Sequence, residues 1–158
     1  MVEPPRKPLV YVDANPFVYA LEGAEDLAAA LGELFARFRQ NPGSAVTSEL
    51  TLAEVLPKRK IPDRYFLDLL VWSKVFDLQP ITRDILIETA EYRRISATTL
   101  PDGKVMLPRL PDAIHVVTAI RSQCEIFLSS DSRMKLPQGM KLVNADKGSV
   151  EALVRELA

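Results

Sequence analysis

The sequence predicts an α/β fold, a single domain in which a parallel sheet is covered by helices on both faces. Short apolar runs alternate along the chain with longer segments whose apolar residues recur at helical spacing. This alternation is typical of strand–helix–strand units, whose right-handed crossovers make neighbouring strands parallel. A chain of 158 residues is long enough for one core. We therefore expect residues 1–158 to form one domain, with the polar, proline-rich residues 1–8 as a flexible segment before it.

Five segments have the pattern of strands, which predicts a five-stranded sheet. The first, residues 9–12, is a continuous apolar run rich in β-branched and aromatic residues, as expected of a strand buried on both faces. The other four are residues 45–47, 76–78, 126–128 and 141–143.

Seven helices are expected between and after these strands. Thr82 is a predicted N-cap for the helix after the third strand, with Ile85, Leu86, Thr89 and Ala90 on its inner face. Trp72 is expected in the core rather than as a stacking platform for a base. Residues 98–109 are expected to be a loop that turns at Pro101-Asp102-Gly103. The other helices are expected at residues 15–22, 24–39, 48–56, 63–74, 111–123 and 149–157.

The composition restricts the chemistry that the chain can perform. With Cys124 as its one cysteine and His115 as its one histidine, the chain can form no internal disulfide and no Cys/His zinc site. A metal would therefore be held by oxygen, which favours Mg²⁺ or Mn²⁺. No signal segment or membrane span is visible, so we expect a cytoplasmic protein. The net charge of −1 gives no global positive field for nucleic acid.

Four acids occupy positions at which an α/β sheet builds sites. Asp13 and Asp131 follow strands, Asp112 opens a helix, and Glu54 lies in the helix after the second strand. Each has a simpler interpretation: an Asp at a helix start is commonly a cap, and Glu54 can pair with Lys58 at the surface. If the four converge, their mutual repulsion requires a cation, and divalent ions promote phosphodiester hydrolysis.

Each of these acids lies in a short segment of characteristic composition. The segments are Val10-Tyr11-Val12-Asp13-Ala14-Asn15, Thr47-Ser48-Glu49-Leu50-Thr51-Leu52-Ala53-Glu54-Val55, Leu110-Pro111-Asp112-Ala113-Ile114-His115 and Leu128-Ser129-Ser130-Asp131-Ser132-Arg133-Met134. They resemble the ordered acidic motifs of PIN domains, and their closest similarity is to VapC-type toxins of toxin–antitoxin modules. The resemblance spans residues 9 to about 143.

The resemblance implies a Mg²⁺- or Mn²⁺-dependent ribonuclease with a five-stranded parallel sheet. It also implies a homodimer and inhibition by a small antitoxin protein that occupies the groove beside the acids. By the same resemblance, Asn15 and Ser129 are supporting polar residues. Ala14 and Ser130 depart from the family pattern, in which a hydroxyl residue and an Asn are common at these positions. The implied catalytic and metal-binding residues are Asp13, Glu54, Asp112 and Asp131.

Three functions are compatible with these observations. The first is an RNA endonuclease toxin whose phosphates are guided by Lys58, Arg59, Arg133 and Lys135, although a solvated helix end also explains the first two cations. The second is a PIN-fold module that binds RNA or protein with little turnover. The third is a phosphatase with a strand-end Asp nucleophile, which is disfavoured because Asn15 stands where a second acid is usual. His115, three residues after Asp112, could contact the surroundings of the metal ligands, but we expect it to face the core.

Overall fold

A parallel sheet of five strands forms the centre of the computed structural model, which describes residues 2–158. The strand order is β3-β2-β1-β6-β7, and each neighbouring pair is parallel. The predicted α/β class and five-stranded parallel sheet are therefore confirmed. The strands are β1 (Val10–Val12), β2 (Ala45–Ser48), β3 (Asp77–Gln79), β6 (Ile126–Ser129) and β7 (Lys141–Asn144).

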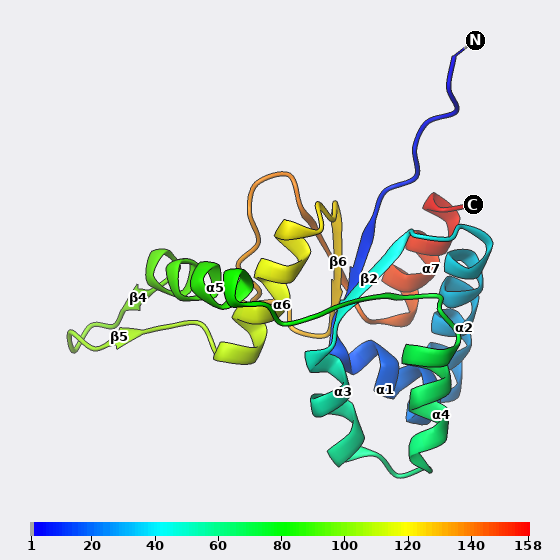
Figure 1. Cartoon of the computed structure of the whole chain (residues 1–158), viewed down its shortest axis with the longest axis horizontal. Coiled ribbons are helices and arrows are strands. Elements are labelled where there is room, and N and C mark those ends of the chain that lie inside the picture. The colour runs from blue at the N-terminus through cyan, green and yellow to red at the C-terminus, as the bar shows by residue number, and fades with distance from the viewer. Residues whose placement is uncertain (1) are drawn as a thin grey trace.

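Helices cover both faces of the sheet, as Figure 1 shows. One face carries α1 (Ala14–Glu22), α2 (Glu25–Gln40) and α7 (Lys147–Glu156), and the other carries α5 (Arg83–Ile95) and α6 (Leu110–Arg121). The short helices between β2 and β3 are α3 (Leu50–Val55), η1 (Leu56–Lys58), α4 (Asp63–Leu67) and η2 (Asp68–Trp72).

The central strand β1 is buried on both faces, as its apolar run predicts. Val10 and Val12 belong to the larger core, which contains residues of α1, α2 and α7. Tyr11 points to the opposite face, where it stacks on Phe127 with ring centroids 5.0 Å apart. Since side chains alternate along a strand, one strand supplies both cores.

An aromatic cluster holds α1 and α2 against the segment that enters β3. The ring of Phe76 lies edge-on to Phe17 and to Phe35, with centroids 4.9 Å and 5.1 Å apart. These are favourable geometries for aromatic pairs. The cluster therefore fixes α1, whose first residue directly follows Asp13.

Trp72 is not a core residue, and that prediction is wrong. Its exposed fraction is 60%, whereas Phe66 and Leu70 are fully buried. Residues four apart share one face of a helix, so Phe66 and Leu70 form the inner side and Trp72, two positions further on, lies outside it. The expected helix over residues 63–74 also changes at Asp68 to a π-helix, which ends at Trp72.

The segment between α5 and α6 also differs from prediction. It contains an antiparallel hairpin of β4 (Thr98–Thr99) and β5 (Val105–Met106), which extends away from the sheet in Figure 1. The predicted turn lies at its tip, where Gly103 has a φ of +83°. On α5, Thr82 caps the helix as predicted, and Ile85 and Thr89 are buried, but Leu86 and Ala90 are exposed.

The N-terminal segment has no helix or strand over residues 2–9, and residues 2–7 are exposed. Its flexibility stays a prediction, and Met1 lies outside the described residues. Within residues 2–158, no helix is long and apolar enough to cross a membrane.

We expect Phe17→Ala to lower the free energy of unfolding by about 3–5 kcal/mol, because it empties a fully buried aromatic site. Trp72→Ala is the matched control and should cost about 1 kcal/mol or less, because that ring is largely exposed. Urea titration of both variants tests this. A larger loss for Trp72→Ala than for Phe17→Ala would contradict the observed packing.

Candidate active site

The acids gather where the order of the strands changes direction. From β1 the chain builds β2 and β3 on one side, and it later adds β6 and β7 on the other. In open α/β sheets, ligands bind at the carboxyl ends of the strands at such a switch point. Asp13 follows β1 and Ser129 ends β6, and the Ser129 hydroxyl donates to Asp13 Oδ2 at 2.8 Å.

Asp13 has one of the two roles that the sequence left open, that of a helix cap. Its Oδ1 accepts a hydrogen bond from the Ala14 backbone N–H at 2.8 Å and so caps α1. Its exposed fraction is only 8%, and its two oxygens contact different partners. A carboxylate has about four lone-pair positions, so the cap leaves capacity for a further contact.

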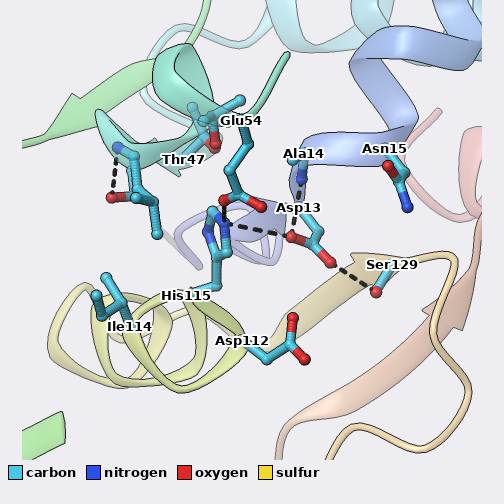
Figure 2. Close-up of polar contacts among 12 residues, drawn as sticks. Asp13, Ala14, Asn15, Thr47, Glu54, Asp112, Ile114, His115 and Ser129 are labelled. Carbon is cyan, nitrogen blue, oxygen red and sulfur yellow. Dashed lines mark hydrogen bonds and ion pairs between the residues drawn. The ribbon is translucent and has the colours of Figure 1, made fainter. Parts of the chain in front are cut away.

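Glu54 faces His115 rather than Lys58. The Nε2 atom of His115 contacts Glu54 Oε1 and lies 3.5 Å from Asp13 Oδ1 (Figure 2). No ion pair joins Glu54 to Lys58 among residues 2–158. After Val55 the chain tightens into the 3-10 helix η1, in which residues four apart no longer share a face. The surface interpretation of Glu54 is therefore wrong.

His115 is fully buried on α6, as expected of a core-facing histidine, and it also reaches the acids. Burial by itself lowers the pKa of this imidazole. The hydrogen bond to Glu54 and the charges of Asp13 and Asp112 outweigh burial, so the net shift of the pKa is upward. The acidic environment thus favours a proton on the ring.

Asp112 and Asp131 have opposite electrostatic environments. Burial, together with the charges of Asp13 and Asp131, raises the pKa of Asp112 despite its ion pair with Arg109 at 3.4 Å. The backbone N–H of Arg133, which donates to Asp131 Oδ1 at 2.9 Å, is the main cause of the lowered pKa of Asp131. The charges of Asp13 and Asp131 therefore both affect the ionisation of Asp112.

The two supporting residues connect the loops of the site. Besides donating to Asp13, the Ser129 hydroxyl accepts from the Asp131 backbone N–H at 3.1 Å. Asn15 Nδ2 donates to the Ser130 hydroxyl at 2.8 Å and so joins α1 to the loop after β6. Ser130 therefore has a partner on α1.

A groove of about 350 Å³ lies beside Asp112 and Asp131. Two of the predicted phosphate contacts, Arg133 and Lys135, line it, whereas Lys58 and Arg59 do not. Lys135 Nζ donates at 2.8 Å to Ser96 O and to Thr98 Oγ1, and Arg59 pairs with Asp63. The rest of the lining includes Arg109 and the apolar residues Met106, Leu107, Pro108 and Met134.

Two contributors to the site were not identified from the sequence. The sequence predicts Tyr11 only as part of a buried strand, yet its hydroxyl lies 2.6 Å from His115 Nδ1. Arg109 was not selected, although it stands three residues before Asp112, the spacing at which side chains meet on one helix face. The spacing could have identified Arg109, whereas the sequence carried no signal for Tyr11.

The donor set fits a hard divalent cation. Its acids supply only oxygen, and a cation would offset both the burial and the repulsion by Asp13 and Asp131 that raise the pKa of Asp112. Cys124 precedes β6, at the opposite end of that strand, and burial raises the pKa of its thiol to about 12. Within residues 2–158, no three acidic, histidine or cysteine side chains lie close enough together to enclose an ion.

The arrangement places the chain in the class of open α/β proteins whose polar side chains gather at the carboxyl ends of parallel strands, where such sheets bind ligands. The chain belongs to the PIN domain family, whose model matches residues 10–138. The resemblance inferred from the four motifs is thereby confirmed at the level of the family.

One similar solved structure is a chain of VapBC2 from Rickettsia felis bound to a DNA fragment from their promoter. The two chains are 16% identical, with a TM-score of 0.61 over 86% of this chain and 98% of that chain. At this identity the likeness supports the fold. A comparison with curated protein sequences gave no match.

We expect Asp112→Asn to raise stability at pH 7 in the presence of a chelator. The pKa of Asp112 is higher in the folded than in the unfolded chain, so ionisation disfavours the folded state, and stability falls as the pH rises through this pKa. Urea titration should show the variant to be more stable at pH 7. The difference should vanish near about pH 3, where the carboxyl is mostly protonated in both states. Equal stability at pH 7 would contradict this environment.

Proposed function

We propose that the chain is a Mg²⁺- or Mn²⁺-dependent endoribonuclease, the VapC-type toxin of a type II toxin–antitoxin pair. The observation that carries the proposal is that Asp13 and Glu54 meet at His115 at the switch point of a PIN-family sheet, with Asp112 coupled electrostatically to Asp13 and Asp131. A protein without need of a cation would gain stability by losing such repulsion.

The ion would be held by Asp13, Glu54, Asp112 and Asp131. When bound, Mg²⁺ or Mn²⁺ lowers the pKa of a coordinated water and polarises the phosphoryl oxygen. Neither ion requires a nitrogen or sulfur ligand, which agrees with an all-carboxylate set.

The chain itself supplies orientation. The Ala14 N–H and the Ser129 hydroxyl hold both oxygens of Asp13, so its carboxylate direction is set before any ligand arrives. Fixed groups of this kind lower the reorganisation needed during reaction. Ser129 also holds the backbone of Asp131, so one hydroxyl sets the relative position of two acids.

Cations beside the acids suit a phosphate backbone. Arg109 and Arg133 pair with Asp112 and Asp131 and line the groove, so each can exchange a carboxylate for a phosphate once an ion neutralises the acids. Lys135 lies further along the same groove. Lys58 and Arg59, at the end of η1, would contact RNA outside it.

A protein partner is part of the proposal. The VapBC2 neighbour supports an antitoxin for this chain, since that structure holds a toxin–antitoxin pair on promoter DNA. Exposed Met106 and Leu107 on the groove wall provide apolar area for such a partner. A homodimer is proposed by the family resemblance alone.

We expect Asp13→Asn to lower Mn²⁺-dependent RNA cleavage by about 100-fold or more, because a metal ligand contributes several kcal/mol to transition-state stabilisation. Single-turnover cleavage of structured RNAs by the purified protein measures the effect. Asp146→Asn is the matched control: Asp146 also follows a strand and caps a helix, but both of its oxygens bind Ser149.

Activity that survives in Asp13→Asn would overturn the assignment of the site. A wild-type protein that binds RNA but never cleaves it with either ion would favour the binding-module alternative. Equal loss in both variants would indicate that capping, rather than chemistry, explains the effect.

A further inference from the structure

A buried hydrogen-bond chain leads from the core to the acids. The Tyr11 hydroxyl lies 2.6 Å from His115 Nδ1, and both residues are fully buried. On the other side of the ring, His115 Nε2 contacts Glu54 Oε1 and lies 3.5 Å from Asp13 Oδ1. Figure 2 shows the imidazole directed between these two carboxylates.

The direction of these hydrogen bonds follows from their partners. An ionised carboxylate only accepts, so Nε2 must carry the proton that is donated to Glu54. In the neutral ring, Nδ1 is then the acceptor, and the Tyr11 hydroxyl donates to it. The Tyr11 hydroxyl can donate to the neutral ring or accept from the protonated ring, so it holds Nδ1 in either state.

The chain connects elements that are otherwise separate at the site. Tyr11 belongs to β1, His115 to α6 and Glu54 to α3. The tyrosine ring is held by stacking on Phe127, and it meets the imidazole edge-on with centroids 5.8 Å apart. A side chain confined in this way has little freedom to change rotamer.

Glu54 has the greatest need of such a restraint. Asp13 receives two further hydrogen bonds, from Ala14 and Ser129. Glu54 has His115 as its one hydrogen-bond partner among residues 2–158, and its side chain is 24% exposed. Without the imidazole, its long side chain would be free to turn to solvent.

We propose that Tyr11 and His115 are positioning residues of the acidic site: Tyr11 holds the imidazole of His115 so that its Nε2–H keeps Glu54 beside Asp13. This inference rests on the proposed function, since it gives the pair a role in the affinity of the acids for a divalent cation. Partners that orient metal ligands typically contribute 10–100-fold to metal affinity.

Two substitutions of His115 separate the two ring nitrogens. The amide nitrogen of Gln reaches the position of Nε2, whereas that of Asn reaches only the position of Nδ1. We expect His115→Asn to weaken Mn²⁺ binding by about 10–100-fold. His115→Gln keeps the donor to Glu54 and loses only the contact with Tyr11, so it should weaken binding less than His115→Asn and no more than Tyr11→Phe. Tyr11→Phe, which keeps the stacked ring, should weaken binding by about tenfold at the lower end of that range.

The experiment is calorimetric Mn²⁺ titration of the purified full chain and its variants, with circular dichroism to establish that each is folded. Thr118→Val is the matched control, because Thr118 is a buried polar residue of the same helix. Its hydroxyl has Ile114 O as its one hydrogen-bond partner among residues 2–158. That variant should bind Mn²⁺ as the wild type does, whatever its stability.

Wild-type affinity in folded His115→Asn and Tyr11→Phe would overturn the inference while leaving the proposed function intact. Equal weakening in His115→Asn, His115→Gln and Thr118→Val would also overturn it, because a general effect of core damage would then explain the loss. Absence of Mn²⁺ binding in the wild type would overturn the proposed function and, with it, this role for the pair.

Discussion

The burial of the Asp13 carboxylate at the end of the central strand is the constraint on which the site depends. A buried charge is costly unless hydrogen bonds or a counter-charge compensate it. Three different elements supply that compensation: the first residue of α1, the last residue of β6 and His115 of α6. These elements meet at the switch point of the sheet, so the fold itself supplies the groups that compensate the buried charge of Asp13.

The remaining acids are tuned by different means. Asp131 is ionised easily because the Arg133 backbone stabilises its charge, whereas burial and neighbouring acids oppose the charge on Asp112. Paired carboxylates with environments that push their pKa values apart are typical of functional sites. Helix capping alone does not require Asp112 to lie where the charges of Asp13 and Asp131 raise its pKa.

Much of the fold follows from local patterns in the sequence. The five strands and their parallel arrangement were predicted from apolar runs separated by helical segments, and Thr82 was identified as a cap. The errors arose where local pattern does not define burial. Trp72 is apolar and helical, but only its neighbours show that the inner face is already filled by Phe66 and Leu70. The β4–β5 hairpin is too short to have a recognisable strand pattern.

The sequence by itself determined the α/β class, the PIN-type order of the acids and the restriction of any metal site to oxygen ligands, because these depend on residue type and spacing. Tertiary structure alone decided which groups meet. Glu54 contacts His115, 61 positions along the chain, and not Lys58. Tyr11 contacts His115 from within the core, across 104 positions. Contacts at such separations are set by how the strands and helices pack. Spacing along the chain carries no information about such contacts.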